Sequence, residues 1–268
     1  MPNYFSKHPK IETTFHDVHL SGLPDTAVGT RIAHLTDIHR SSTTSDRVIE
    51  AAVAIILKLK PDVILITGDF VSFNSKDIAP CAELLAPLEA KLGVFAILGN
   101  HDYTSDSDQV KVQMSKRGIR FLINKNVALL NGLVLAGIDD DREGKIDLVR
   151  AFEGIDAASP TVTMIHNPTV VERIADRNGL VLAGHTHGGQ VNLPMVVDTQ
   201  VRRIGAKHYK AGWYRLGKAQ LYVNRGIGQV LIPFRINSTP EVALFTLQNR
   251  SSATEKNKGE MQKTFLSG

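Results

Sequence analysis

The stretch RIAHLTDIHRSS, residues 31–42, places a carboxylate and an imidazole directly after a short apolar run. The run is typical of a buried strand, and Asp37 and His39 follow where that strand is expected to end. One such pair identifies nothing, because an aspartate after a strand can also cap the next helix. Its meaning depends on how the other strands of the chain end.

Four more apolar runs end in groups that can bind a metal. They lie at residues 62–69, 93–100, 161–166 and 179–187, and the groups at or just after their ends are Asp69; Asn100, His101 and Asp102; His166; and His185 and His187. Each residue alone could be a helix cap, a turn residue or a packed core histidine. The five strand ends together hold five of the ten histidines, which indicates one shared site.

The chemistry of these groups predicts a pair of divalent ions. Carboxylate and amide oxygens together with imidazole nitrogens suit Mn, Fe, Zn, Co or Ni better than Ca or Mg alone. A carboxylate can bridge two ions through its two oxygens, and two-metal sites hold their ions about 3.5–4 Å apart. We therefore expect two divalent transition-metal ions as cofactors, with manganese favoured.

The wider pattern predicts an α/β fold with more than one sheet. The segment after residue 45 reads as a helix that Thr44 or Ser45 caps and Pro61 ends, and residues 78–91 read as another helix. Residues 119–139 read as two strands joined by a turn at Asn131 and Gly132, and more strands are expected beyond them. A first half that alternates strand and helix and a β-rich second half favour a layered fold.

The order D-x-H, G-D, G-N-H-D, a lone histidine and G-H-x-H resembles the motifs of the calcineurin-like metallophosphoesterases, over residues 31–190. The segments GHTHGGQVNLP, YVNRGIG and PFRINSTPEVALFTL are similar to a small bacterial phosphodiesterase branch of that family. This branch includes enzymes that act on envelope lipids and UDP-diacylglucosamine. The resemblance implies a four-layer α/β/β/α sandwich of the metallo-dependent phosphatase type, with the site at the strand ends.

The resemblance also implies a role for each candidate residue. The two ions would be bridged by Asp69 and otherwise held by Asp37, His39 and His187 at the first position and by Asn100, His166 and His185 at the second. His101 would be the catalytic histidine, with Asp102 as its supporting partner. Two ions, two ionised aspartates and a bridging hydroxide carry a net charge of about +1, which suits an anionic phosphoester.

These features favour a phosphodiesterase in which a metal-bridging hydroxide attacks phosphorus in line and His101 acts as general acid. Its partner would be a phosphoester substrate, either a small molecule or lipid-linked. One alternative is a UDP-2,3-diacylglucosamine pyrophosphohydrolase or another envelope-lipid phosphohydrolase. An alternative of another class is a non-catalytic metal-binding scaffold, which the complete ligand set disfavours.

Substrate contacts are less well defined by the sequence. Arg40 stands where many relatives carry a small or apolar residue after D-x-H, and its guanidinium could bind two phosphate oxygens or be a solvated loop charge. His208, in the loop region of residues 192–213, is a second candidate for substrate binding. Arg235 and Asn237 are further candidates, with loop or sheet-edge structure as the alternative.

Composition sets the outer limits. The 268 residues are 43% apolar, and we expect one domain over residues 1–249 followed by a polar, disordered tail at 250–268. The formal charge of +4 is compatible with anionic partners, yet no lysine and arginine cluster forms a track for nucleic acid. The single cysteine, Cys81, excludes an intrachain disulfide and is expected in the core.

The apolar runs are too short to cross a bilayer, and the N-terminal residues lack the apolar region of a secretory signal. We therefore expect a soluble cytoplasmic protein. Peripheral contact at the inner membrane surface stays open.

Overall fold

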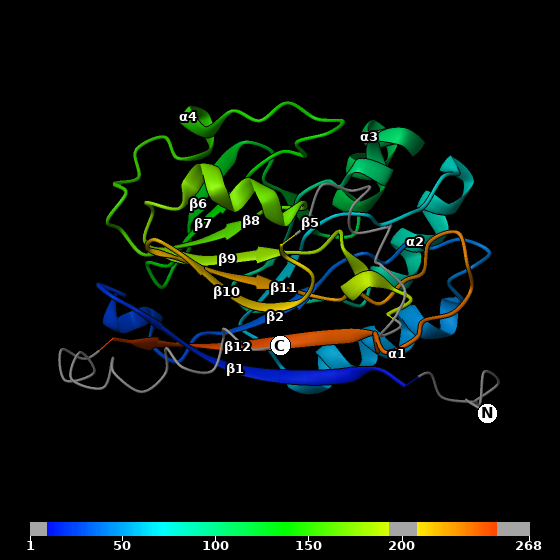
Figure 1. Cartoon of the computed structure of the whole chain (residues 1–268), viewed down its shortest axis with the longest axis horizontal. Helices are drawn as coiled ribbons and strands as arrows, with labels where there is room; N and C mark the ends of the chain where they lie inside the picture. The colour runs from blue at the N-terminus through cyan, green and yellow to red at the C-terminus, as the bar shows by residue number, and fades with distance from the viewer. Residues whose placement is uncertain (1–9, 193–207, 251–268) are drawn as a thin grey trace.

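The computed structural model describes residues 10–192 and 208–250 of the chain. Two six-stranded sheets, each with parallel and antiparallel pairs, pack face to face. Helices cover the outer side of each sheet (Figure 1). This is the four-layer α/β/β/α sandwich that the resemblance implied.

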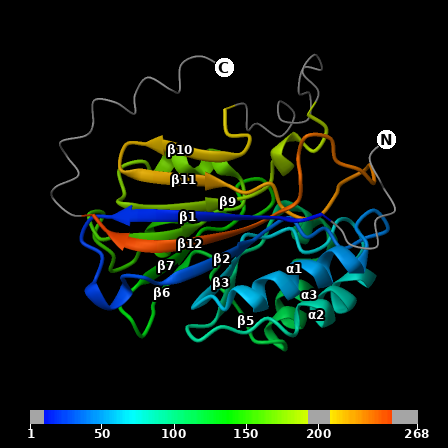
Figure 2. The same ribbon diagram turned by 90° about the horizontal axis from the view of Figure 1, so that it is seen from below.

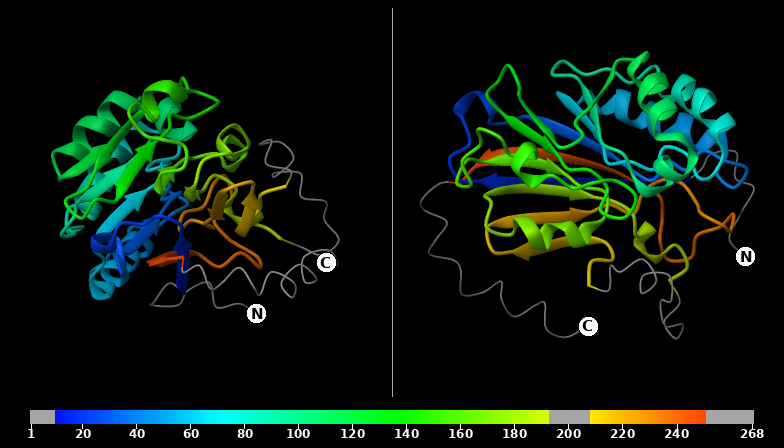
Figure 3. Two further views of the ribbon diagram at one scale, coloured as in Figure 1. Left: turned by 90° about the vertical axis from the view of Figure 1, so that its left-hand side faces the viewer. Right: turned by 90° about the horizontal axis from the view of Figure 1, so that it is seen from above.

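The first sheet carries three of the five strand ends. Its strands in spatial order are β1 (Glu12–Leu20), β12 (Glu241–Asn249), β2 (Arg31–Leu35), β3 (Val63–Ile66), β4 (Val94–Ala96) and β5 (Ile119–Phe121). The four strands from β2 to β5 are parallel, and β12 runs antiparallel to β2. Strands β1 and β12, from the two ends of the described chain, lie side by side and parallel (Figure 3).

The second sheet carries the other two strand ends. Its spatial order is β10 (Gly212–Leu216), β11 (Ala219–Val223), β9 (Gly179–Ala183), β8 (Thr161–Met164), β7 (Val134–Gly137) and β6 (Lys125–Ala128). The four strands from β11 to β7 are parallel to one another, and β10 and β6 are antiparallel edges.

The helices follow from the apolar pattern. On the first sheet lie α1 (Asp46–Leu59), α2 (Ile78–Leu85) and α3 (Asn100–Ser115), which Figure 2 shows gathered on one side of the molecule. The second sheet is covered by α4 (Leu148–Ala151) and the 3-10 helix η3 (Pro168–Ile174). The described ranges also contain three short 3-10 turns: η1 (Asp25–Ala27), η2 (Ser75–Asp77) and η4 (His187–Gly189).

Helix α1 has the face expected from its sequence. Ile49, Ala52, Val53 and Ile56 are buried against the first sheet. The helix ends when Lys60, with φ of 49°, turns the chain ahead of the proline at position 61. Ser45 is its N-cap by position, although its side chain makes no capping hydrogen bond.

Several element predictions need correction. The second helix ends at Leu85, not at residue 91, and Pro87 two positions later cannot continue it. Residues 119–139 form three strands, because β5 pairs with β4 in the first sheet before β6 and β7 form the expected hairpin. The turn of that hairpin does lie at Asn131 and Gly132, where Gly132 has φ of 78°. Helix α3 and strand β10 were not predicted.

The described residues bear on two further predictions, the domain boundary near residue 249 and the absence of a membrane-spanning helix. Strand β12 ends at Asn249, and the expected tail lies outside the described residues apart from Arg250, so the domain boundary stays a prediction. Among the helices of the described ranges, none combines the length and apolar character that crossing a bilayer requires.

Cys81 lies in the core, as expected, and provides a test of the fold. The side chain on α2 is fully buried, and its thiol donates a weak hydrogen bond to the Phe70 carbonyl at 3.4 Å. Burial raises the pKa of the thiol far above its usual value, so the thiolate is scarce at pH 8. We expect no reaction of the native protein with Ellman's reagent at pH 8 and one thiol per chain in denaturant. Rapid reaction of the native protein would contradict this packing.

Candidate metal centre

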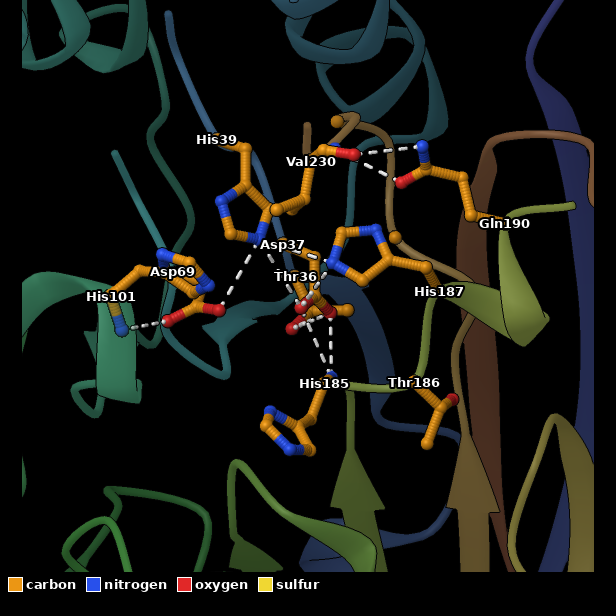
Figure 4. A network of polar contacts seen from close by, with 12 residues as sticks. Thr36, Asp37, His39, Asp69, His101, His185, Thr186, His187, Gln190 and Val230 are labelled. Carbon is orange, nitrogen blue, oxygen red and sulfur yellow. Dashed lines mark hydrogen bonds and ion pairs between the residues drawn. The ribbon is translucent and has the colours of Figure 1, made fainter. Parts of the chain in front are cut away.

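The five strand ends converge on one place between the sheets. Strands β2, β3 and β4 are neighbours in the first sheet, and β8 and β9 are neighbours in the second. Parallel strands present their carboxyl ends at the same edge, so the residues after them meet there. Figure 4 shows Asp37, His39, Asp69 and His187 directed toward one another from these ends, with the backbone nitrogen of His185 at Asp37.

Hydrogen bonds fix the two sheets to each other at this point. The backbone N–H of His185 donates to both oxygens of Asp37, at 3.1 and 2.9 Å. In the other direction, Nδ1 of His166 lies 2.7 Å from the Thr67 carbonyl and must donate to it. Each sheet therefore orients a side chain of the other.

The backbone of the ligand residues is held in an unusual conformation. Asp37, His39, Asp69, His185 and His187 all have positive φ, between 47° and 71°. Aspartate and histidine tolerate this region better than most residues, but it still costs free energy and persists where surrounding structure enforces it. Five such residues in one place mark the strand ends as a functional site.

Two glycines leave room for this crowding. A Cβ on Gly99 would lie 2.2 Å from Oδ1 of Asp69 and 2.7 Å from the His166 ring. A Cβ on Gly226 would lie 2.5 Å from the Cβ of Asp37. No other residue type fits at either position without displacing a candidate ligand.

The first group of side chains comprises Asp37, His39 and His187, whose ligand atoms all lie within 4.8 Å of one another. Nε2 of His187 lies 3.4 Å from Oδ1 of Asp37 and 3.1 Å from Nε2 of His39. All three residues are buried. These are the residues predicted for the first ion.

The second group comprises Asp69, His166 and His185. Nε2 of His166 lies 3.2 Å from Oδ2 of Asp69 and 3.1 Å from Nδ1 of His185. The same Oδ2 atom lies 3.2 Å from Nε2 of His39 in the first group. Asp69 therefore contacts both groups, as a bridging carboxylate would.

The electrostatics suit a cation. Burial by itself would raise the pKa of Asp37 and Asp69, but the adjacent histidines hold both well below the usual value. Burial would lower the pKa of His39, but Asp69 and Asp37 raise it to about 9. For His185, burial dominates and lowers the pKa to about 3. Two buried carboxylates are thus anionic at neutral pH, beside a histidine that stays neutral.

Two orphaned atoms strengthen the fit to metal. Oδ1 of Asn100 and Nε2 of His185 are buried and have no hydrogen-bond partner among the described residues. A buried polar atom without a partner costs about 1–3 kcal/mol, so such atoms call for an explanation. For Asn100, predicted to bind the second ion through its amide oxygen, a divalent cation would supply the missing partner. The donor set therefore fits a pair of divalent ions.

His101 lies at the same site, and the carboxylate of Asp102 accepts hydrogen bonds from backbone N–H groups. One ring nitrogen of His101 lies within 4.8 Å of ligand atoms of His39 and Asp69, and its Nδ1 lies 2.7 Å from the Ser72 carbonyl. No hydrogen bond joins the side chains of Asp102 and His101 within residues 10–192 and 208–250. Because Asp102 is the third residue of α3, its carboxylate turns back and accepts the Gly99 N–H at 3.0 Å.

The carboxylate of Asp102 holds the turn after β3 as well. It accepts the N–H of Asp69 at 2.9 Å and the N–H of Phe70 at 2.8 Å. Asp102 therefore fixes the backbone of Asp69, the residue that contacts both groups, and its pairing with His101 stays a prediction.

The ion pairs of Arg40 and the ring contact of His208 are with residues outside the two groups of candidate metal ligands. Arg40 forms ion pairs with Asp77 and, at 3.1 Å, with Asp46. Binding of phosphate by Arg40 would require these pairs to open, so its role in substrate binding stays a prediction. His208 is exposed and lies near the ring of Tyr209, and residues 193–207 of the adjoining loop lie outside the described ranges.

The sequence reasoning missed the end of β7. Asp140 is buried, accepts the N–H groups of Arg142 and Glu143 through one oxygen, and leaves the other oxygen without a partner among the described residues. Burial lowers the pKa of His185, and the positive charge of the nearby Arg142 lowers it further. The signal was present, because acids directly follow this apolar run as they follow β2 and β3.

It also missed Gln190, which supports the site from one side. The buried amide donates to the carbonyls of Val230 and Ile232 at 3.0 and 3.1 Å and accepts the Val230 N–H at 2.9 Å. Figure 4 shows Val230 beside His39 and His187. Gln190 thus holds a loop from β11 against the candidate ligands.

Comparison with known proteins decides the family. The model of the calcineurin-like phosphoesterase family matches residues 30–189, which contain every residue of both groups. The chain belongs to this family. It is thereby a metal-dependent phosphoric ester hydrolase, as the sequence predicted.

Relatives match almost the whole chain. Uncharacterized metallophosphoesterase YkuE of Bacillus subtilis is 30% identical over 258 residues, covering 92% of this chain and 88% of the relative. Phosphodiesterase YaeI of Escherichia coli is 32% identical over 236 residues, covering 85% and 86%. UDP-2,3-diacylglucosamine pyrophosphatase LpxG of Chlamydia trachomatis is 25% identical over 274 residues, covering 81% and 83%.

The role of Asp102 gives a testable prediction. In the Asp102→Asn variant, an amide N–H₂ group faces at least one of the three backbone N–H donors, so we expect a loss of about 1–3 kcal/mol in the free energy of unfolding. Urea unfolding measures it. Asp108→Asn, an exposed carboxylate on the same helix, should change stability by less than about 0.5 kcal/mol. Equal effects of the two substitutions would contradict the positioning role.

Proposed function

We propose that this protein is a phosphodiesterase that uses two divalent ions. The observation that supports this most is the pair of oxygen and nitrogen donor groups that Asp69 connects, together with the buried and unpartnered amide oxygen of Asn100. The first ion is held by Asp37, His39 and His187, and the second by Asn100, His166 and His185. Manganese is the favoured metal, because this donor set suits transition metals.

The protein residues then orient a phosphoester between the sheets. Bound divalent ions supply charge stabilisation for the phosphoryl oxygens and lower the pKa of a water nucleophile to near 7. Asp69 sets the spacing of the two positions, and Asp102 holds the backbone of Asp69. The buried strand ends exclude bulk water, which strengthens every electrostatic interaction there.

His101 is the general acid of this proposal. The Ser72 carbonyl occupies Nδ1, so Nε2 is the nitrogen free to carry a proton to the leaving oxygen. The ring of Phe73 packs edge-on against His101 with centroids 4.9 Å apart and restrains its orientation. Burial lowers the pKa of His101, which makes its protonated form a readier proton donor.

A second candidate is hydrolysis of an envelope-lipid pyrophosphate, which the similarity to LpxG supports. The chemistry at phosphorus would be the same, and the substrate would be lipid-linked. The expected cytoplasmic location, with contact at the inner membrane surface, fits either substrate class.

The first experiment measures metal content together with hydrolysis of bis(p-nitrophenyl) phosphate and p-nitrophenyl phosphate, with and without Mn²⁺. We expect close to two metals per chain and faster cleavage of the diester. Preference for the monoester would replace the phosphodiesterase by a phosphatase. Absence of both metal and turnover would support the non-catalytic scaffold and end the proposal.

Two substitutions test separately the general-acid role of His101 and the bridging role of Asp69. His101→Ala should keep both ions and lose about 10²–10⁴-fold in kcat, because only proton transfer is removed. Asp69→Asn should lower metal content itself, because an amide oxygen bridges two cations poorly. Metal analysis and steady-state kinetics measure both effects.

The matched control is His19→Ala, an exposed histidine on β1, which should leave both quantities unchanged. Unchanged kcat in the His101 variant would remove the general-acid assignment. Full metal occupancy in the Asp69 variant would remove the bridge.

A further inference from the structure

The helix that begins at Asn100 is interrupted after six residues. Asp106 has an extended backbone inside α3, with φ of −177° and ψ of 90°, and its carboxylate accepts the N–H of Gln109 at 2.9 Å. An aspartate that accepts the N–H three positions later acts as the N-cap of a new helix. Residues 100–105 therefore form a turn of their own, which depends on contacts outside the helix for its place.

This turn carries two residues of the candidate centre, and the first sheet holds it on one side. Asn100 supplies the unpartnered amide oxygen, and the N–H of His101 donates to Oδ1 of Asp69 at 2.9 Å. Asp102 accepts N–H groups from the chain that follows β3. These contacts fix the turn to the first sheet. The histidines predicted to share an ion with Asn100 follow β8 and β9 in the second sheet.

A tyrosine joins the same turn to the second sheet. The hydroxyl of Tyr103 donates to Oδ1 of Asp139 at 2.5 Å, the short distance typical of a hydroxyl that donates to a carboxylate. Within residues 10–192 and 208–250, this is the one hydrogen bond from the turn to the second sheet or its loops. The ring of Tyr103 packs at the edge of the first sheet's core, so the link between the sheets is made by the hydroxyl.

Asp139 is itself held firmly enough to act as an anchor. Its carboxylate is buried and accepts the N–H groups of Asp140 and Lys145, both at 2.9 Å. A Cβ on Gly144 would lie 2.5 Å from Oδ1 of Asp139, so the loop leaves the carboxylate little room to turn. The oxygen that Tyr103 meets therefore has a fixed position.

This anchor lies beside a candidate ligand of the second sheet. Strands β7 and β8 pair in parallel with Gly137 opposite Met164. Asp139 and His166 each follow two residues later and are therefore level with each other. The hydrogen bond of Tyr103 thus spans from the Asn100 turn to the strand ends that carry the rest of the second group.

We propose that Tyr103 is a positioning residue for the second metal position, where its hydrogen bond to Asp139 sets the distance of the Asn100 amide from the histidines of the second sheet. The inference rests on the proposed two-metal function. A functional group must be held within about 0.5 Å of its productive geometry, so loosening this link weakens the Asn100 contact. The first position has no candidate ligand on the turn and does not depend on Tyr103.

The test is a titration of the metal-free protein with Mn²⁺, followed by the electron paramagnetic resonance signals of free and bound ion. The wild type should bind two ions, whose spins couple once both positions are filled. Tyr103→Phe keeps the ring and removes only the hydroxyl. One binding step should then weaken by about tenfold, the lower end of the range for outer partners of metal ligands, while the other stays within about twofold.

A comparison with Asn100 separates positioning from general support of the fold. Asn100→Ala should weaken the same binding step, because the amide oxygen is lost. In that background, Tyr103→Phe should cause a further loss of less than about twofold, because the turn no longer carries a ligand for the ion. Losses that simply multiply would show that the hydroxyl acts elsewhere and would overturn the inference.

Two more variants complete the experiment. Asp139→Ala removes the acceptor of the same hydrogen bond and should weaken the same step, and it replaces Tyr103→Phe if that variant does not fold. Tyr209→Phe is the matched control, because it removes a tyrosine–carboxylate hydrogen bond of 3.1 Å to Glu172 on η3. It should bind Mn²⁺ as the wild type does. Circular dichroism shows that each variant is folded.

The outcomes separate this inference from the proposed function. A wild type that binds fewer than two Mn²⁺ ions overturns the two-metal function and the inference with it. Two binding steps in the wild type and the same two steps in Tyr103→Phe overturn the inference alone. Equal weakening of both steps in a folded variant also overturns it, because Tyr103 would then support the whole site.

Discussion

The hydrogen bonds from the His185 backbone to the carboxylate of Asp37 join the two sheets where the candidate ligands meet. The contact of His166 with the Thr67 carbonyl joins them a second time, in the opposite direction. Every ligand distance across the site therefore depends on how the sheets pack. That packing is set by the apolar core between them, which includes Leu65, Phe95 and Leu182.

The site stores free energy that a simple core would not. Imidazole nitrogens lie 3.1 Å apart in both groups, two carboxylates are fully enclosed, and five of the candidate ligand residues have positive φ. Each of these features destabilises the fold by itself. They can be tolerated because the two sheets and the surrounding hydrogen bonds leave the strand ends no alternative. Divalent cations would convert the same features into favourable contacts.

Supporting residues form a shell behind the ligands, and each acts through a different chemistry. Asp102 accepts the backbone N–H of Asp69, Gln190 donates to the loop beside His187, and Arg235 donates to the carbonyl of His187. Asp102 thus acts on Asp69, which contacts both groups, whereas Gln190 acts on the side of His39 and His187.

Much of the fold could be read from local patterns, and the failures have physical causes. Helix α1 and the short buried strands have strong apolar periodicity, so they were predictable. Helix α3 was missed because its sequence, NHDYTSDSDQVKVQMS, is mostly polar and is held by its place after β4. Strand β5 is three residues long and pairs only because β4 lies beside it.

The sequence by itself determined which residues form the centre, because carboxyl ends of parallel strands share an edge and metal-capable groups follow five of them. Only the tertiary structure decided what stands behind each residue. Asp102 accepts hydrogen bonds from the backbone N–H groups of residues 69 and 70. Arg40 forms ion pairs with Asp46 and Asp77, and Arg235 donates a hydrogen bond to the carbonyl of His187. These contacts join segments far apart in the chain, so they depend on packing geometry and leave no local pattern in the sequence.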